Sequence, residues 1–452
     1  MIVMKFGGSS LISAGLIQNT VNIIKNHLHS QPVVVVSAMG KTTRNLLTVA
    51  QNAANGSLKE AQLLLKDQVL DYHLEIINSF KSYRGYNQLI KKINIYNSEI
   101  ITDLGMIVKR QEISPFLQDK VLSYGELMSS SILNYVLVGN GIRSKLLDAR
   151  YFILTDNCFT HANPIRDKCY SEIQHNIEPL IRDSVIPITQ GYIGATSSGE
   201  ATTLGFEGSD YSAVLIGAAL GVDEIQTWKD VNGILSSDPT MIAKTQTITH
   251  MSYDEAGELS RCGAKVLHLE TIKPAREKNI PLKICNINNP ALSYTTIDDH
   301  DQLPSVPVKS ITFKEKLTHL QIFSKGVIAE IDFIAKVFSS LKTFDIVPFH
   351  IVGSSNHLDL VIPDFQATDI LKKDLNTIAS LEINHEKATI SLIGDISKIR
   401  DEISGVVSTY VAHNIILREM VSNSCTFLID SKDLTPILNI LHAYYFKDGS
   451  DE

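Results

Sequence analysis

Short apolar runs alternate with helical patterns over about the first 295 residues of the chain. The runs that predict strands lie at residues 2–6, 33–37, 185–189, 224–228 and 281–284. The run Val33-Val34-Val35-Val36 is apolar at every position, which is typical of a strand covered on both faces. Between the runs, apolar residues recur with helical spacing at 17–28, 46–54 and 210–219. This alternation predicts an α/β sandwich with a mainly parallel sheet.

The pattern changes between about residues 286 and 310, where Pro290, Pro304 and Pro307 lie among Asn, Asp and Ser. Such a segment is typical of a linker or a domain edge. A weak internal repeat follows, and each copy of about 65 residues has roughly the order β-α-β-β-α. The predicted elements lie at 317–323, 331–341, 346–352, 358–361 and 368–375 in the first copy, and at 389–393, 399–411, 415–420, 425–429 and 434–444 in the second.

These changes divide the chain into three predicted domains, at residues 1–295, 310–385 and 386–452. Repeats as small as the last two commonly pair side by side to bury their exposed strand edges. We therefore interpret them either as packing modules or as ligand-sensing modules.

Composition narrows the class of protein. Of the 452 residues, 44% are hydrophobic and 20% are charged, a balance that supports a large buried core and excludes disorder of the whole chain. The net charge of −8 argues against a nucleic-acid-binding protein, which would show a basic stripe. It does not exclude an anionic substrate, because nearby lysines and backbone N–H groups set the field of a binding site.

The cysteines are few, scattered and odd in number: Cys158, Cys169, Cys262, Cys285 and Cys425. They imply no disulfide framework and fit a reducing compartment. We expect no metal site made by the protein alone, because the Cys and His residues lack zinc-like spacing and His27 and His29 fit a solvated helix surface.

The apolar runs do not fit a signal peptide or a membrane span. The N-terminal apolar run is broken at Lys5 and is too short for a signal peptide. The longest apolar stretch, at about residues 213–222, is shorter than the roughly 20 residues that a membrane span needs. We therefore expect a cytoplasmic protein without a membrane partner.

Glycines and small polar residues follow two of the predicted strands. The first strand leads into Gly7-Gly8-Ser9-Ser10, where backbone N–H groups can approach an anion and Lys5 adds a positive charge, although the pair of glycines also suits a plain turn. The second leads into Ser37-Ala38-Met39-Gly40-Lys41-Thr42-Thr43, which lacks the spacing of a Walker loop. Thr42 and Thr43 are either helix N-caps or hydroxyl donors to a carboxylate.

A third segment is unusually rich in glycine. Gln190-Gly191-Tyr192-Ile193-Gly194 follows a strand, and the run Thr202-Thr203-Leu204-Gly205-Phe206-Glu207-Gly208-Ser209-Asp210-Tyr211-Ser212 opens onto a helix. The N-terminus of a helix favours anions, so Ser209 and Asp210 are either N-caps or residues of a binding site.

Three charged residues allow two interpretations each. Asp230, in Trp228-Lys229-Asp230-Val231-Asn232-Gly233, either holds a turn or contacts a ligand. Lys265, after a helix-ending glycine in Cys262-Gly263-Ala264-Lys265-Val266-Leu267-His268, is either a helix C-terminal charge or a ligand contact. Glu126, in Ser123-Tyr124-Gly125-Glu126-Leu127-Met128-Ser129, suits the first turn of a helix or a pair with a substrate ammonium group.

Together these runs resemble the aspartokinases of the amino-acid kinase family. The matching runs are Lys5-Phe6-Gly7-Gly8-Ser9-Ser10, Val35-Val36-Ser37-Ala38-Met39-Gly40, Gly125-Glu126-Leu127-Met128-Ser129, Gln190-Gly191-Tyr192-Ile193-Gly194, Thr202-Thr203-Leu204-Gly205, Gly208-Ser209-Asp210-Tyr211 and Gly263-Ala264-Lys265-Val266-Leu267-His268. They occur in the order and spacing of the family over essentially the whole chain. The C-terminal repeat resembles the tandem ACT domains of the same enzymes.

The resemblance implies a three-layer αβα sandwich followed by two ferredoxin-like ACT domains of βαββαβ order. It implies transfer of the γ-phosphoryl group of ATP to the β-carboxylate of L-aspartate, giving 4-phospho-L-aspartate for lysine, threonine and methionine synthesis. Mg²⁺ would arrive bound to ATP. The ACT pair implies a homodimer or higher homo-oligomer, inhibited by a pathway end product such as lysine or threonine.

The resemblance also assigns roles to residues. It implies that catalysis depends on Lys5, Gly8 and Asp210. The substrate would be held by Thr43, Glu126, Ser209 and the position of Phe206. The nucleotide would be contacted by Gly7, Gly8, Ser9, Lys229, Asp230, Leu235, Lys265 and Val266.

Several positions depart from the family pattern. Phe206 stands where many relatives have an arginine that binds the substrate α-carboxylate, and phenylalanine cannot replace that contact. Leu235 and Thr240 replace a tyrosine and an arginine, and Val347-Pro348-Phe349 lacks an acidic residue often associated with lysine. Two alternatives therefore stay open, a kinase of the same fold for another small acidic amino acid and a catalytically weak amino-acid sensor. Retention of Lys5, Glu126 and Asp210 weighs against the sensor.

Overall fold

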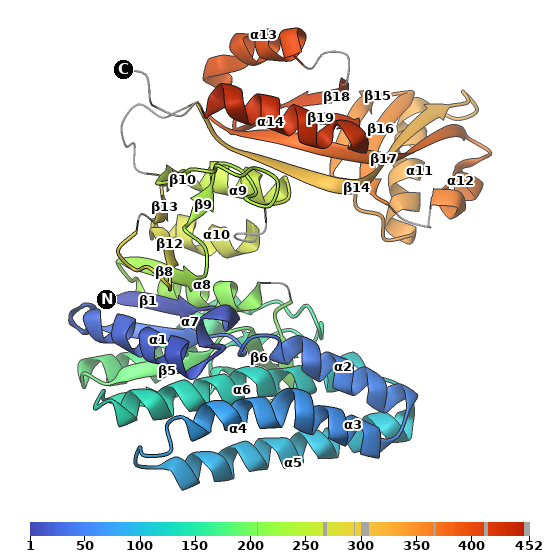
Figure 1. Cartoon of the computed structure of the whole chain (residues 1–452). Helices are drawn as coiled ribbons and strands as arrows, with labels where there is room; N and C mark the ends of the chain where they lie inside the picture. Colours follow the sequence, from blue (N-terminus) through green and yellow to red (C-terminus); the bar gives the residue numbers. More distant parts are fainter. Residues whose placement is uncertain are drawn as a thin grey trace, which may run out of the picture. The chain divides into compact units, whose positions relative to one another are not determined.

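The computed structural model describes residues 1–205, 207–264, 269–292, 294–299, 307–364, 368–410 and 415–446 (Figure 1). The chain divides into two compact units, and each is described by itself. The first comprises Met1–Ile234 and Leu267–Asp299, and the second comprises Leu235–Val266 and His300–Glu452. In the described part of the chain, no helix combines the length and the apolarity that a membrane crossing requires.

A largely parallel sheet forms the centre of the first unit. Its strands lie in the order β13-β12-β8-β1-β2-β5-β3. Their bounds are β1 Ile2–Phe6, β2 Pro32–Val36, β3 Ser144–Leu146, β5 Ile186–Gln190, β8 Glu224–Lys229, β12 Leu282–Asn286 and β13 Thr295–Ile297. Neighbours pair in parallel except β12 and β13, which are antiparallel. Every residue of β1 and β2 is buried, which confirms the predicted central strands.

Helices cover both faces of this sheet and complete the predicted three layers (Figure 1). One face carries α7 Arg166–Arg182, α8 Gly208–Leu220 and α10 Leu269–Glu277, and the other carries α1 Ala14–Asn26 and α6 Pro115–Gly139. Further helices pack on or near α6: α2 Thr42–Asn55, α3 Leu58–Leu65, the π-helix η3 Lys66–Leu70, α4 Asp71–Asn78 and α5 Tyr86–Arg110. Short 3₁₀-helices are η1 Gly8–Leu11, η2 Leu28–Ser30 and η4 Ala149–Tyr151. A small sheet in the order β4-β6-β7 contains Leu154–Thr155, Ile193–Thr196 and Ala201–Thr203.

The second unit contains the predicted repeat as one sheet in the order β15-β16-β14-β17-β19-β18. The first copy contains β14 Val308–Ser324, α11 Glu330–Thr343, β15 His350–Ser354, β16 His357–Pro363 and α12 Thr368–Leu375. The second contains β17 Ala379–Gly394, η5 Ile396–Ile399, α13 Arg400–Tyr410, β18 Ile415–Met420, β19 Ser424–Asp430, η7 Ser431–Asp433 and α14 Leu434–Tyr445. The predicted β-α-β-β-α order of both copies is therefore confirmed.

The two copies share their central strands. The later part of β14 pairs with the start of β17, for example Ile322 with Leu381, and both belong to the first apolar core. The earlier part of β14 pairs with the end of β17, where Ile311 faces Leu392 and both belong to the second core. Each copy thus completes its βαββαβ set with a strand segment from the other. The predicted boundary between residues 385 and 386 falls inside β17, because that strand serves both cores.

Residues 235–266 belong to the second unit, although the sequence pattern assigns them to the first predicted domain. This segment contains part of β9 Ile234–Leu235, with β10 Thr247–Ile248, β11 His250–Met251 and α9 Tyr253–Arg261. The N–H of Ile311 donates to the carbonyl of Ser236 at 2.7 Å, and Lys309 forms a buried ion pair with Glu255 at 2.7 Å. These contacts tie the segment to β14. The predicted domain limits themselves stay predictions.

Candidate functional site

The site is built at the carboxyl edge of four adjacent parallel strands. Strands β5, β2, β1 and β8 are neighbours, and Phe6 is level with Val36 on one side and Trp228 on the other. Backbone hydrogen bonds continue past the strand ends, from Gly7 N to Trp228 O at 3.1 Å and from Gly191 N to Val36 O at 2.8 Å. The glycine-containing segments that the sequence singles out after β1, β2 and β5 therefore meet at one edge.

The loops after β1 and β2 are in direct backbone contact. The N–H of Gly40 donates to the carbonyl of Gly8 at 3.0 Å. A Cβ atom on Gly8 would lie 2.5 Å from the carbonyl oxygen of Ala38, a distance that real Cβ atoms do not adopt. On Gly7 the nearest atom would be 3.6 Å away, which is an ordinary contact. Only the second glycine is thus required by the packing of the loops.

A buried group of charges lies at this edge. The Lys5 ammonium is 2.9 Å from one oxygen of Asp210, and the Lys229 ammonium is 3.5 Å from the other. Burial lowers the pKa of Lys5, and the charge of Asp210 opposes that shift. Burial alone would raise the pKa of Asp210, but the two lysines outweigh it and hold that pKa below its usual value. The hydroxyl of Thr227 also donates to Asp210 at 3.4 Å.

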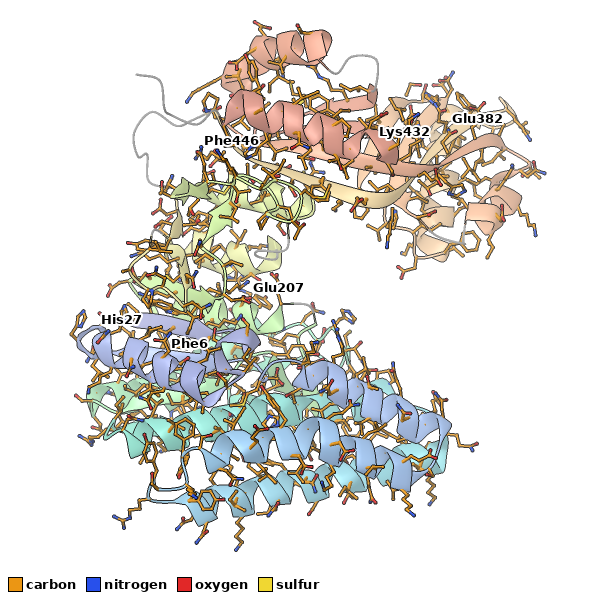
Figure 2. All side chains as sticks on the ribbon, in the orientation of Figure 1. Phe6, His27, Glu207, Glu382, Lys432 and Phe446 are labelled. Atoms are coloured by element: carbon orange, nitrogen blue, oxygen red, sulfur yellow. The ribbon has the colours of Figure 1, made fainter. Side chains whose placement is uncertain are left out.

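Asp210 lies in the first turn of α8, beside the segment after β5. The helix begins at Gly208, and its N-cap is Glu207, whose side chain forms no capping hydrogen bond. Ser209 and Asp210 are therefore not N-caps, and both are buried. A Cβ on Gly191 would lie 2.6 Å from Cβ of Ser209, so this glycine lets the two segments pack. In Figure 2 the labels Phe6 and Glu207 mark the end of β1 and the approach to α8.

Glu126 enters the site from α6. The prediction that it lies at a helix start is wrong, because α6 begins at Pro115, where Ser114 caps it by accepting from Leu117 N. Glu126 is buried in mid-helix and accepts from the N–H of Ala38 at 3.2 Å. Its Oε2 has no hydrogen-bond partner among the described residues. Burial raises the pKa of Glu126 to about 8.

The remaining predicted residues lie on several different elements, and some of them lie outside the described part of the chain. Thr43 is half-buried in the first turn of α2, after the N-cap Lys41, and Ser9 is half-buried in η1. Asp230 is exposed directly after β8. Leu235 ends β9 and belongs to the second unit. Phe206, Lys265 and Val266 lie outside the described residues, so their roles stay predictions.

Sequence reasoning missed three polar residues that shape this region. Thr227 contacts Asp210, as described above. Gln190 ends β5, donates to the hydroxyl of Ser130 at 2.7 Å and accepts from Ala149 N at 2.8 Å. Asp119 is a buried carboxylate on α6. Its spacing of seven residues from Glu126 places both on one helix face, a signal that could have identified it.

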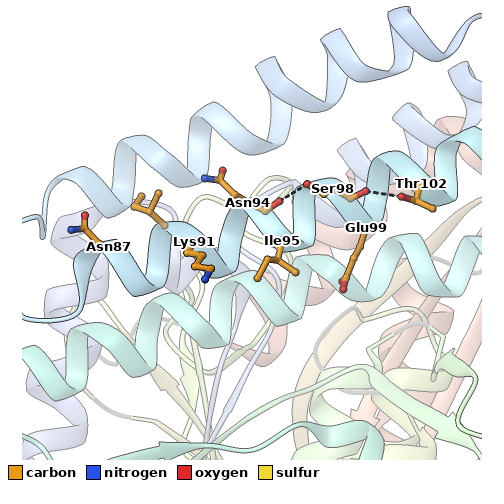
Figure 3. A pocket seen from close by; sticks show the side chains of 8 residues that line it. Asn87, Lys91, Asn94, Ile95, Ser98, Glu99 and Thr102 are labelled. Carbon is orange, nitrogen blue, oxygen red and sulfur yellow. Dashed lines mark hydrogen bonds between the residues drawn. The ribbon is translucent and has the colours of Figure 1, made fainter.

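Two pockets of the first unit lie away from this edge. One, of about 530 Å³, follows α5 and is lined by that helix alone (Figure 3). Another, of about 320 Å³, lies where β2 and β5 begin, beside Pro32 and Ile186. In the described ranges, no three His, Cys, Asp or Glu residues are grouped to hold a metal ion. The charged groups that the structure places at the sheet edge are Lys5, Asp210 and Lys229.

Replacing Gly8 by alanine is expected to destabilise the protein by about 1–3 kcal/mol, because the new Cβ forces the Ala38 carbonyl to move. The same change at Gly7 is the matched control and should leave the free energy of unfolding nearly unchanged. Denaturant unfolding of both variants measures the difference. Equal stabilities would contradict the contact between the two loops.

Comparison with known proteins shows which family the chain resembles. Residues 1–286 match the amino acid kinase family. The chain is 31% identical to aspartokinase 1 of Arabidopsis chloroplasts over 99% of its length and 80% of that protein. It is 26% identical to the lysine-sensitive aspartokinase 3 of Escherichia coli, with 99% of each chain covered.

The solved structures agree. Escherichia coli aspartokinase III in complex with aspartate and ADP superposes with a TM-score of 0.86 over 99% of this chain and 100% of that chain, at 26% identity. The complex of that enzyme with lysine and aspartate superposes with a TM-score of 0.81, at 26% identity and the same coverage. The chain therefore belongs to the amino acid kinase family and, within that family, to the aspartokinases.

Proposed function

We propose that this chain transfers the γ-phosphoryl group of ATP to the β-carboxylate of L-aspartate at the carboxyl edge of its parallel sheet. The products are ADP and 4-phospho-L-aspartate, which feeds lysine, threonine and methionine synthesis. The observation that carries the proposal is the buried Lys5–Asp210–Lys229 group next to the loop of Gly7 and Gly8. A triphosphate bound against this loop would meet the two ammonium groups directly.

In this proposal the phosphates lie against the glycine loop. Gly8 and Ser9 offer backbone N–H groups, Gly7 lets the phosphates approach the backbone because it has no side chain, and Lys5 neutralises charge on the transferring phosphoryl group. Asp210 bridges Lys5 and Lys229, and its charge opposes the burial that lowers the pKa of Lys5. On the nucleotide side we assign Lys229, Asp230, Leu235, Lys265 and Val266. Mg²⁺ arrives on the phosphates of ATP and adds positive charge there.

The amino acid lies between this group and α6. Glu126 pairs with the substrate ammonium through the oxygen that has no partner among the described residues. Thr43 and Ser209 offer hydroxyl groups to the carboxylates. The attacking carboxylate is already ionised at neutral pH, with a reference pKa near ~4, so no general base is needed. Catalysis then depends on in-line positioning and charge stabilisation.

Replacing Lys5 by alanine should lower kcat by at least roughly tenfold, equivalent to about 1.4 kcal/mol of barrier. A coupled assay of ADP release with aspartate and ATP measures it, and a panel of other amino acids tests the substrate. Lys25, an exposed lysine at the end of α1, gives the matched control Lys25→Ala. Wild-type turnover in Lys5→Ala would refute the role of Lys5, and preference for another acid would refute aspartate as the substrate.

The raised pKa of Glu126 predicts a pH dependence. Its carboxyl is neutral well below pH 8 and ionises as the pH rises through about 8, so the KM for aspartate should fall over that range. In the absence of substrate, ionisation of Glu126 at higher pH is expected to lower the stability of the folded protein. Between about pH 4.5 and about pH 8 the folded state keeps a proton that the unfolded state has lost, so the free energy of unfolding falls as the pH rises.

Glu126→Gln removes both effects. Its KM for aspartate should be high and flat with pH, and its melting temperature should exceed that of the wild type most at about pH 8. Kinetics and thermal unfolding across the pH range provide the two measurements. A variant that keeps the pH profile of the wild type would show that another group titrates.

We further propose that the second unit binds an amino-acid effector, lysine or threonine, and that the chain works as a homodimer or higher homo-oligomer in the cytoplasm. Support comes from the Escherichia coli enzyme, whose structure with lysine and aspartate is named as its T-state. Titration of each amino acid into the ADP-release assay should give inhibition by at least one. Unchanged activity with both, at millimolar concentrations, would remove the regulatory proposal.

A further inference from the structure

Asp119 is a buried carboxylate two helical turns before Glu126 on α6, and its side chain makes no ion pair among the described contacts. It accepts three hydrogen bonds instead. The donors are Thr160 N at 2.8 Å, Thr203 N at 2.9 Å and the Thr203 hydroxyl at 2.6 Å. Burial raises the pKa of Asp119, and these three bonds oppose the shift. A carboxylate so placed needs its donors, since losing one leaves a buried charge less satisfied.

The donors come from two segments that Asp119 joins to α6. Thr203 is the last residue of β7, and Thr160 belongs to a loop between β4 and α7. The two segments are also joined to each other, because Ala162 N donates to Thr203 O at 2.9 Å. Asp119 therefore fixes the position where β7 ends.

Three residues around the end of β7 and the start of α8 have an unusual backbone conformation. Thr160, Tyr192 and Glu207 have φ angles of 73°, 66° and 56°, in the left-handed region that non-glycine residues rarely adopt. The carbonyl of Tyr192 accepts from Leu204 N at 2.9 Å, and a Cβ on Gly208 would lie 2.9 Å from the Tyr192 ring. Residues in such conformations persist only where the surroundings fix them, and they concentrate at functional sites.

We propose that Asp119 is a positioning residue that, through Thr203, holds the end of β7 at a fixed place relative to Glu126 and so sets the affinity for the amino-acid substrate. This inference rests on the proposed function. Both carboxylates project from one face of α6. In this proposal Glu126 contacts the substrate, and Asp119 holds the end of β7 in place. Asp119 makes its hydrogen bonds with β7 and the loop between β4 and α7, whereas Lys5 and Lys229 come from β1 and β8, so we expect the larger effect on the amino-acid side.

The test compares Asp119→Asn and Thr203→Val with Thr203→Ser. Asparagine replaces one carboxylate oxygen by an NH₂ group, which cannot accept a hydrogen bond from Thr160 or Thr203. Valine at position 203 removes only the hydroxyl donor. Both should raise the KM for aspartate about tenfold, with the KM for ATP and kcat within about threefold of wild type. Serine restores the hydroxyl and should return the KM for aspartate to within about twofold.

Asp103→Asn is the matched control. Asp103 is equally buried, on α5, and binds Lys120 at 2.6 Å and Tyr124 at 3.4 Å. Its replacement should lower the melting temperature without changing the KM for aspartate.

Two outcomes would overturn the inference: a wild-type KM for aspartate in folded Thr203→Val, or equal rises in the KM values for aspartate and ATP. Thr203→Val decides the question even if Asp119→Asn does not fold, because it leaves two of the three bonds in place. A wild-type protein without aspartate-dependent ADP release would instead overturn the proposed function itself.

Discussion

The buried set of Lys5, Asp210 and Lys229 is the interaction on which the rest of the site depends. Removing three charges from water is costly, and the attraction between them repays that cost only in part. Lys5 and Asp210 are almost fully buried, and Lys229 is partly exposed. Replacing a buried ion pair by apolar residues is often neutral or stabilising, so the arrangement is easier to explain by ligand binding than by stability.

Parallel strand order is what assembles this set. Lys5 and Lys229 come from adjacent strands that are more than 200 residues apart in the chain, and Asp210 comes from the helix that precedes β8. The loops can approach one another only where side chains are absent, as at Gly8 and Gly191. These two glycines thus matter because they have no side chain. Each lets two backbone segments pack in the space that a methyl group would fill.

Local sequence patterns predict most helices and strands. The features that they do not predict depend on contacts between residues far apart in the sequence. The central strands are recognisable because both of their faces are buried, which makes each of them a continuous apolar run. The position of Glu126 differs from the prediction, because α6 begins at Pro115 and Glu126 lies in the middle of the helix. Gly125 also lies within α6, where a Cβ would come within 2.9 Å of the Ala38 side chain. Asp119 was missed because its partners lie 41 and 84 residues away.

The same limit applies to the C-terminal repeat. Sequence periodicity shows the two copies but not that β14 and β17 each run through both cores. The register of the pair shifts between Lys314 and His319, where the strands pass from one core to the other. α9 is attached to this sheet by Glu255, which pairs with Lys309, and by Glu258, which accepts from Ser424 at 2.9 Å. These contacts explain why residues 235–266 belong to the second unit, although the sequence pattern assigns them to the first predicted domain.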